Sequence, residues 1–426
     1  MKTETRLGAW GSGRAATWLL LAFCLGPVRG GVDLGLPEKS PAALGLSAAR
    51  LERVPAMLLR EIDARHYAGA VWLVARDGAV ASHGAIGWSD VAAHAVMTED
   101  TMFRVFSMTK IVTTVTVLTL VEEGRLNLDD PVERYVPALA HRQVLTGGTA
   151  EAPQFEPANG PITIRQLLTH TSGLTYDIFA AEPLKTIWAK SEMWHSQSLK
   201  EFVSKVAALP LAHQPGARWT YGVNMDVLGA VVEAVTGQDL ETAMHERIFR
   251  PLHMTHTTFR EDDYVRSHLA TIHHRTPAGT LEKDEGMTGL GTLAFPSGGG
   301  GLFSTLHDYA RFGQMLVNGG ELDGARVLGR LTGQMMATNQ IAHLGPGDPW
   351  RPAAFGFGVR VRPADEHAAK AIGSPGEFGW DGLATTSVSM NPRERMLLLV
   401  LLQHAPWNED GIFEKFEDTV YQAVEK

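Results

Sequence analysis

The stretch from Ile111 to Leu120, IVTTVTVLTL, constrains the fold of this chain more than any other feature. All of its residues are aliphatic or threonine, and Gly124 follows as a helix stop. A helix without a polar face is buried on most sides, so other elements must surround it. The chain has 426 residues, of which 44% are hydrophobic, and this is enough to build such a core.

Strand patterns lie near both ends of the chain. Residues 69–90 hold two apolar runs joined by Asp77-Gly78, which is a strong signal for a hairpin. Three further strands are predicted within 355–363, 377–392 and 395–406, the last two joined by a turn at Asn391-Pro392-Arg393. Amphipathic helices are predicted outside these strands, at 47–64 and 413–426.

The middle of the chain, roughly residues 125–345, shows helical patterns separated by Pro and Gly. Helices are expected to end at Gly173 and Gly237 and to begin near Ser304. The economical fold is therefore α+β. One antiparallel sheet forms from both chain ends and is flanked by the terminal helices, and a large, mostly helical lobe is inserted. A site is expected between the two lobes.

Residues 1–30 have the pattern of a signal peptide. Basic residues precede the apolar segment 15–26, AATWLLLAFCLG, which is short for a membrane span. We expect export to the periplasm or secretion, no stable membrane span, and a mature domain over 45–426. The alternatives are an uncleaved N-terminal anchor and a start of translation further along the chain. The one cysteine, Cys24, lies in this segment, so disulfides and thiol chemistry are excluded for the rest of the chain.

Several function classes lack their sequence signals. The net charge is −9 without a basic run, which argues against nucleic acid as a partner. The pairs His253/His256 and His273/His274 lack an H-E-x-x-H pattern, and we expect neither metal nor cofactor. The segment 297–301, SGGGG, is not followed by Lys-Ser/Thr, so it predicts a tight turn rather than a phosphate loop. No G-x-S-x-G elbow is present.

Ser107 and Lys110 stand where the apolar helix is expected to begin. On a helix, residues three apart share a face, with about 5–6 Å between them. A hydroxyl at a helix N-terminus meets N–H groups and a dipole that favour developing negative charge. A capping serine with a solvated lysine would show the same pattern. The apolar character of the helix favours a catalytic pair over a solvated lysine. A lysine buried there needs a partner or a role, such as that of a base.

With the motifs downstream, the chain resembles the serine β-lactamase and penicillin-binding-protein superfamily. Within it, the chain is most similar to the class C-like branch that includes the family VIII carboxylesterases. The ordered motifs are FSMTK (106–110), ITIRQLLTHTSGL (162–174), QPGARWTYGVNMDVLGAVVEAVTG (214–237), IFRPLHMTHTTF (248–259), SGGGGLFSTLHDYARFGQML (297–316) and GEFGWDGLATT (376–386).

The resemblance implies a β-lactamase/transpeptidase-like fold and a covalent acyl-enzyme on Ser107. Lys110 and Tyr221 would then take the serine proton, and the backbone N–H groups of Ser107 and Leu383 would form the oxyanion hole. Tyr176 would line the acyl pocket. Without the resemblance, Tyr221 would more often be a core or rim residue, and Tyr176 could equally be an ordinary loop aromatic.

Departures from the family pattern bear on the substrate. Val223 stands where lactamases have an Asn, and Trp380-Asp381-Gly382 replaces the usual Lys-Thr-Gly. Loss of that lysine, with Asp381 beside the cleft, is expected to disfavour carboxylate substrates. Gly382 would let the substrate lie against the strand, and Trp380 would contact it or simply pack.

We therefore predict a serine hydrolase that cleaves small or aryl carboxylic esters. The alternatives on the same machinery are a weak β-lactamase and a D-amino-acid amidase or peptidase. The alternative of another class is a non-catalytic ligand-binding module of the same fold.

Overall fold

The computed structural model describes residues 34–290, 292–345, 351–364 and 371–426. The predicted signal peptide, residues 1–30, lies outside the described residues. Over the ranges that are described, no helix has the length and apolar character needed to cross a membrane.

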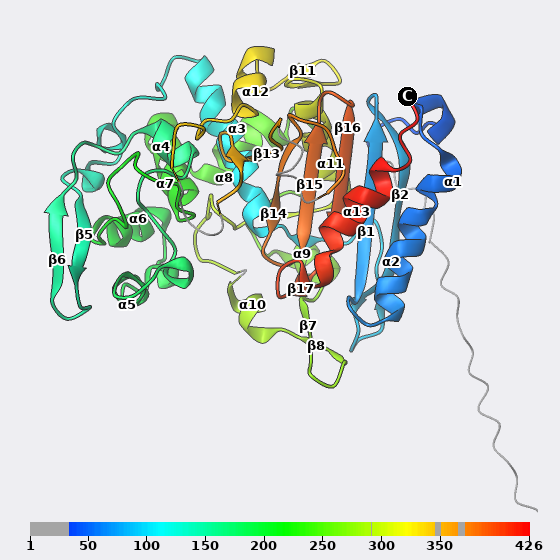
Figure 1. Cartoon of the computed structure of the whole chain (residues 1–426), viewed down its shortest axis with the longest axis horizontal. Helices are drawn as coiled ribbons and strands as arrows, with labels where there is room; N and C mark the ends of the chain where they lie inside the picture. The colour runs from blue at the N-terminus through cyan, green and yellow to red at the C-terminus, as the bar shows by residue number, and fades with distance from the viewer. Residues whose placement is uncertain (1–33, 291, 346–350, 365–370) are drawn as a thin grey trace, which may run out of the picture.

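The main sheet has eight strands, all antiparallel to their neighbours (Figure 1). The first strand pairs with a strand from the far end of the chain, with Val71 opposite Leu401. The prediction of one sheet built from both chain ends is therefore confirmed. In spatial order the strands are β12 (Ala354–Phe355), β13 (Arg360–Val361), β14 (Phe378–Gly382), β15 (Thr386–Asn391), β16 (Met396–Leu401), β1 (Gly69–Arg76), β2 (Ala79–Asp90) and β3 (Ala95–Val96).

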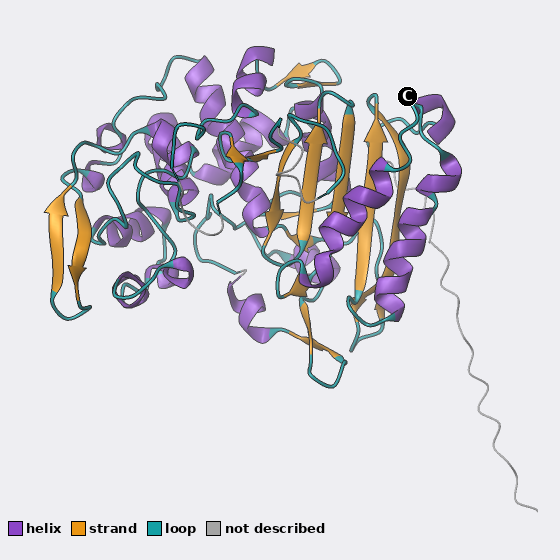
Figure 2. Cartoon of the chain, viewed as in Figure 1, coloured by secondary structure: helices purple, strands orange, loops and turns teal. Residues whose placement is uncertain are grey.

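Helices cover both faces of this sheet (Figure 2). Three terminal helices pack on one face: α1 (Ala48–Leu51), α2 (Arg53–Asp63) and α13 (Ile412–Tyr421). Helix α11 (Leu306–Val317) packs on the other face, against β1, β15 and β16. The single helix predicted at 47–64 is broken at Glu52 into α1 and α2. The alternating residues of β1 serve two cores, since Trp72 faces the terminal helices and Leu73 faces the opposite side.

Turn chemistry explains one success and one failure of the strand prediction. Asp77 and Gly78 both have positive φ, 54° and 73°, as the predicted β1–β2 hairpin requires. The segment 377–392, predicted as one strand, is instead the hairpin β14–β15. Its left-handed turn position holds Thr385, at φ 62°, rather than the Gly or Asn that would mark a turn at that position.

The inserted lobe is mostly helical but also contains small sheets. Its helix α7 ends at Gly237 with φ 73°, as predicted, whereas the helix expected to run to Gly173 stops at Leu168. The helices of this region are α4 (Ile164–Leu168), α5 (Leu184–Ala189), α6 (Leu199–Ala207), α7 (Asn224–Thr236), α8 (Leu240–Met244), α9 (Asp263–His268), α10 (Glu285–Leu290) and α12 (Arg330–Met336). The short strands outside the main sheet are β4 (Phe103–Arg104), β5 (Gln143–Gly148), β6 (Pro153–Pro157), β7 (His273–Arg275), β8 (Leu281–Lys283), β9 (Phe303–Ser304), β10 (Glu321–Leu322), β11 (Ala325–Arg326) and β17 (His404–Ala405).

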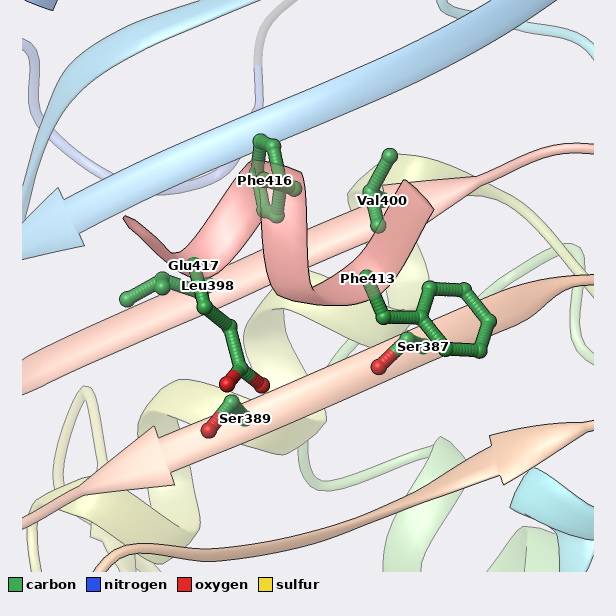
Figure 3. Close-up of a pocket in the computed structure, with 7 residues that line it drawn as sticks. All are labelled: Ser387, Ser389, Leu398, Val400, Phe413, Phe416 and Glu417. Carbon is green, nitrogen blue, oxygen red and sulfur yellow. The ribbon is translucent and has the colours of Figure 1, made fainter. Parts of the chain in front are cut away.

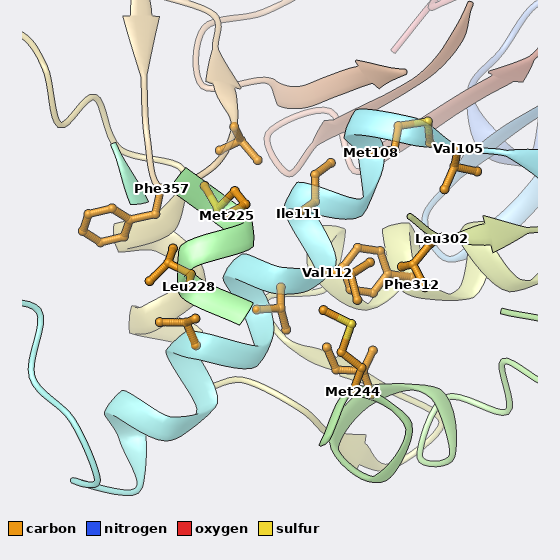
Figure 4. Close-up of a cluster of buried hydrophobic side chains, with 14 of the residues drawn as sticks. Val105, Met108, Ile111, Val112, Met225, Leu228, Met244, Leu302, Phe312 and Phe357 are labelled. Carbon is orange, nitrogen blue, oxygen red and sulfur yellow. The ribbon is translucent and has the colours of Figure 1, made fainter. Parts of the chain in front are cut away.

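The apolar helix is α3 (Thr109–Glu122), and it is buried from Thr109 to Leu120. It packs against α7 and α8, and Figure 4 shows Ile111 and Val112 among side chains of both helices. Three of its threonine hydroxyls, those of Thr113, Thr116 and Thr119, donate to carbonyl groups, such as Thr116 to Val112 at 2.9 Å, so they are tolerated in this core. Surrounding elements thus hold the start of α3 in a fixed position.

Candidate active site

Ser107 lies on a 3-10 turn, Phe106–Met108, that leads directly into α3. Its side chain is partly exposed, whereas Lys110, one turn further, is only 1% exposed. The residue before the serine, Phe106, has φ 40°, in the left-handed region that non-glycine residues rarely adopt. The backbone therefore presents a reachable hydroxyl above a buried amine.

Two proton-carrying groups converge on the Ser107 hydroxyl. The Lys110 amine donates to Ser107 Oγ at 3.1 Å, and the Tyr221 hydroxyl donates to the same oxygen at 2.8 Å. Lys110 Nζ also lies 4.8 Å from the centre of the Tyr221 ring and 5.5 Å from that of Tyr176. The structure thus brings four of the predicted site residues together, although Ser107 and Tyr221 are 114 positions apart.

Tyr221 is held by aromatic neighbours. The Trp380 indole N–H donates to the Tyr221 hydroxyl at 3.1 Å, which orients that hydroxyl toward Ser107. The Tyr221 ring stacks on Trp219, with centroids 6.0 Å apart and planes 12° apart. Tyr176 meets the same ring edge-on at 5.4 Å, and Phe179 lies at 5.8 Å. Trp380 and Tyr176, both predicted site residues, therefore contact Tyr221 directly.

The glycine-rich turn supplies a partner for Lys110 that sequence analysis missed. The Gly299 carbonyl accepts a hydrogen bond from Lys110 Nζ at 2.5 Å. The same turn is tied to the buried Asp226, whose Oδ1 accepts from the Ser297 hydroxyl at 2.5 Å and from the Gly299 N–H at 3.1 Å. Burial raises the pKa of the Asp226 carboxyl, and the positive charge of Lys110 opposes that rise. In the sequence, only the motif Asp226-Val227-Leu228-Gly229 and the glycines at 298–301 indicated this arrangement.

His170 is a second buried group beside Tyr221 that the sequence did not assign to the site. Its ring centre lies 5.0 Å from that of Tyr221, and its Nδ1 is 2.8 Å from the Asn224 amide nitrogen. Burial, with the charge of Lys110 as a smaller cause, holds the pKa of His170 well below its usual value, so the ring is neutral. Asn224 is thus committed to His170 and to the Ser172 hydroxyl, which donates to it at 2.5 Å.

Two predicted substrate contacts lie elsewhere. Val223 is fully buried in the core, so it presents nothing to a substrate. The Asp381 side chain points to the opposite face of β14 from Trp380, because successive residues of a strand alternate. Its carboxylate pairs with Arg360 at 2.6 Å and accepts from Ser387 at 2.7 Å. The expected repulsion of carboxylate substrates by Asp381 therefore has no support in the geometry.

Gly382 also has a different use from the one expected. A side chain there would lie 2.5 Å from the Val105 carbonyl and 2.2 Å from the Thr386 hydroxyl. The glycine thus lets β14 approach the backbone just before Ser107, rather than only making room for a ligand. Leu383, which follows, is partly exposed beside this approach.

A metal-dependent site was not expected from the sequence. Across the described residues, no group of three or more His, Cys, Asp or Glu side chains could hold a metal ion. The histidine pairs considered in the sequence have other contacts: His273, for example, accepts from the Val91 N–H at 3.3 Å.

Comparison with known proteins places the chain in a family. The Beta-lactamase family model matches residues 56–421, and the chain belongs to that family. Esterase EstB of Burkholderia gladioli is 31% identical over 370 residues, covering 80% of this chain and 88% of EstB.

Two solved structures extend the comparison. EstCE1, described as a hydrolase with promiscuous acyltransferase activity, superimposes with a TM-score of 0.72 at 27% identity, covering 89% of this chain and 99% of EstCE1. Unliganded simvastatin synthase (LovD) from Aspergillus terreus superimposes with a TM-score of 0.74 at 26% identity, covering 90% of this chain and 98% of LovD. Family, relatives and fold together define this protein as a serine hydrolase of the β-lactamase-like class.

Proposed function

We propose that this protein hydrolyses carboxylic esters through an acyl-enzyme on Ser107. The observation that carries the proposal is the convergence of Lys110 Nζ and the Tyr221 hydroxyl on one partly exposed serine oxygen, at 3.1 and 2.8 Å. A serine needs a neighbouring base to become a nucleophile, and both groups lie within reach of its proton. The names of EstB and EstCE1 support an esterase rather than a silent binding module.

The reaction would proceed in two half-reactions. Ser107 Oγ attacks the ester carbonyl while its proton passes to the Tyr221–Lys110 pair, and the same pair returns that proton to the leaving alcohol. Water then attacks the acyl-enzyme, again losing a proton to the pair, and the acid leaves as Ser107 regains its hydrogen. The contact from Trp380 to Tyr221, at 3.1 Å, keeps the phenol aimed at the serine through both steps.

Negative charge on the tetrahedral intermediate would be held by the backbone N–H groups of Ser107 and Leu383. Strand β14 packs on the turn that carries Ser107, which supports this pairing. Donors of this kind each contribute about 2.7–4 kcal/mol to transition-state stabilisation. No cofactor enters the proposal.

The surroundings of Ser107 favour uncharged, apolar or aryl acyl groups. Tyr176, Phe179 and Trp380 surround Tyr221, and Tyr176 stacks on Trp194 at 6.0 Å. Trp380 occupies the place of the family's substrate-binding lysine, and Asp381 is neutralised by Arg360 on the other face of the strand. These features support small-molecule esters over the charged lactams and D-peptides of the alternative reading.

The test compares purified enzyme with Ser107→Ala on p-nitrophenyl esters of several acyl lengths and on a chromogenic cephalosporin. We expect ester turnover that Ser107→Ala abolishes, and slow or no cephalosporin turnover. A cephalosporin cleaved faster than every ester would overturn the substrate class. Ester turnover that survives Ser107→Ala would overturn the nucleophile.

Acyl transfer to an alcohol is a second candidate, favoured by the likeness to EstCE1 and LovD. The aromatic groups around Ser107 would shield an acyl-enzyme from water and leave time for an alcohol to attack. Adding a primary alcohol to the ester assay and measuring the new ester against the free acid distinguishes transfer from hydrolysis.

Export remains a proposal, supported by the basic and apolar pattern of residues 1–30. Fractionation of cells that express the full chain, followed by N-terminal sequencing of the product, tests it. A product confined to the cytoplasm and starting at Met1 would contradict export.

A further inference from the structure

The turn between β14 and β15 contains an unusual backbone conformation. Thr385, the residue before β15, is fully buried and has φ 62°. A β-branched residue is rare in the left-handed region, because its branched side chain crowds the backbone there. Such a residue persists only where its surroundings hold it, and residues of this kind are frequent at functional sites.

Apart from the Gly382 carbonyl, which accepts the Thr385 N–H, the hydrogen-bond partners of Thr385 come from the segment after β16. Its hydroxyl donates to the His404 carbonyl at 3.0 Å and accepts from the Asn408 N–H at 3.2 Å. Its carbonyl accepts from the Leu402 N–H at 3.1 Å. The neighbouring Ala384 carbonyl accepts from the His404 N–H, also at 3.1 Å. The turn is therefore tied down by backbone and side chain together, and the threonine hydroxyl serves as both donor and acceptor.

This clamped turn lies against the turn that carries Ser107. Leu383 and Ala384 pack in one apolar cluster with Phe106, the residue before the nucleophile. On the strand side, the Thr386 hydroxyl reaches the Val105 carbonyl at 3.5 Å. Within this turn the Thr385 N–H donates to the Gly382 carbonyl at 3.0 Å. Among the described residues, no backbone carbonyl is found to accept from the Leu383 N–H.

We propose that Thr385 is a positioning residue for the oxyanion hole: its hydroxyl clamp on His404 and Asn408 holds the Leu383 N–H toward Ser107. The inference rests on the proposed function, because it assigns a task to the Leu383 N–H. Thr385 itself is buried and touches no substrate. Without the clamp the turn relaxes out of the left-handed conformation, and the Leu383 N–H turns away from the developing oxyanion.

The test uses Thr385→Val, which keeps the branched shape and removes the hydroxyl, and Thr385→Ser, which keeps the hydroxyl. We expect kcat for a p-nitrophenyl ester to fall about tenfold or more in the valine variant with KM within about threefold, because donors that hold an oxyanion act in the transition state. Inhibition by phenylboronic acid, whose serine adduct is tetrahedral, should weaken by a similar factor. Thr385→Ser should restore most of kcat and of boronate affinity.

Thr116→Val is the matched control, because Thr116 is equally buried and donates to a helix carbonyl away from the turn. It should lower thermal stability without changing kcat or boronate inhibition. If Thr385→Val is insoluble, Thr385→Gly carries the same test, since glycine adopts positive φ without strain.

Unchanged kcat and boronate inhibition in soluble Thr385→Val, with only the melting temperature lowered, would overturn the inference. If Ser107→Ala is inactive in the same experiment, the proposed function is still supported and only the role of Thr385 is excluded. Full activity in Ser107→Ala would instead overturn the proposed function itself, whatever Thr385→Val does.

Discussion

At the scale of single residues, the site is defined by how each hydroxyl and amine is paired. Ser107 receives hydrogen bonds from Lys110 and Tyr221, and Lys110 is anchored in turn by the Gly299 carbonyl. Lys110 is 1% exposed, so the solvated lysine that the pattern alone allowed is wrong. A buried amine held by these contacts lies close enough to exchange a proton with the serine.

Replacing the lysine should remove the chemistry more than the fold. We expect Lys110→Ala to lower kcat on p-nitrophenyl esters by about 10²–10⁴-fold, which is the usual contribution of a general base. Lys415→Ala, which removes a half-exposed lysine paired with Glu61 at 2.8 Å, should retain full activity. Steady-state kinetics with near-ultraviolet circular dichroism would check both. A Lys110→Ala enzyme that remains fully active at neutral pH would exclude Lys110 as the base.

At the scale of elements, turns and strand faces position these side chains. The glycine-rich turn carries Gly299 between Asp226 and Lys110, and β14 aims Trp380 toward Tyr221 while turning Asp381 away. The close approach of Gly299 to Asp226 requires a residue without a side chain. The opposite directions of Trp380 and Asp381 follow from the alternation of side chains along β14. Substitutions in these elements should therefore change activity even though Ser107 and Lys110 themselves are unaltered.

Two adjacent glycines allow a controlled test of the glycine-rich turn. A Cβ at Gly299 would lie 2.4 Å from Asp226 Oδ2, whereas at Gly300 the nearest atom is 3.8 Å away. We expect Gly299→Ala to destabilise the protein by about 1–3 kcal/mol. It should also lower kcat, because the Gly299 carbonyl that anchors Lys110 must shift. Gly300→Ala should match the parent in denaturant unfolding and in kinetics, and equal effects at both positions would contradict this account.

A buried charge cluster joins α13 to the far face of β14 and β15. Figure 3 shows Glu417 of α13 over Ser389 of β15, and Glu417 also pairs with Arg362 at 3.2 Å. Burial, together with the charges of Glu377 and Asp381, raises the pKa of Glu417 to about 8, although Arg360 and Arg362 oppose the rise. Between pH 4.5 and about 8, Glu417 therefore keeps a proton in the folded protein that it loses in the unfolded chain.

That proton makes stability fall with rising pH. The ordinary pKa of the glutamate is 4.5, so between there and about 8 the folded protein binds the extra proton. The free energy of unfolding contributed by Glu417 should then decline across this window. Glu417→Gln lacks the titration, so its melting temperature relative to the parent should rise from pH 5 to pH 8.5. A difference that is the same at both pH values would contradict the raised pKa.

At the scale of the whole molecule, the sheet separates two hydrophobic cores, and only one of them contains the elements around Ser107. One core, under α1, α2 and α13, closes the sheet that joins the chain ends. The other holds α3 and the elements around Ser107. Stability and catalysis should therefore be separable by mutation.

A substitution on the terminal-helix side tests this separation. Phe416 of α13 is 2% exposed, and Phe416→Ala should lower the free energy of unfolding by about 3–5 kcal/mol. Its kcat should stay near the parent value, measured below the unfolding transition. Phe155→Ala, at a side chain 47% exposed on β6, should change neither quantity. A large loss of kcat in folded Phe416→Ala would show that the two cores are coupled.

The sequence by itself determined the sheet from both chain ends, the buried α3 and the family, because these depend on periodicity, turn residues and ordered motifs. It also named Ser107, Lys110, Tyr221 and Trp380, which the fold brings into contact. Only the tertiary structure decided that the Gly299 carbonyl anchors Lys110 and that the Asp381 carboxylate pairs with Arg360. Those contacts depend on which residues, distant in the sequence, the fold brings beside each side chain, and local spacing does not encode that. For the same reason the split of 377–392 at Thr385 was missed, since contacts from residues 402–408 impose that turn.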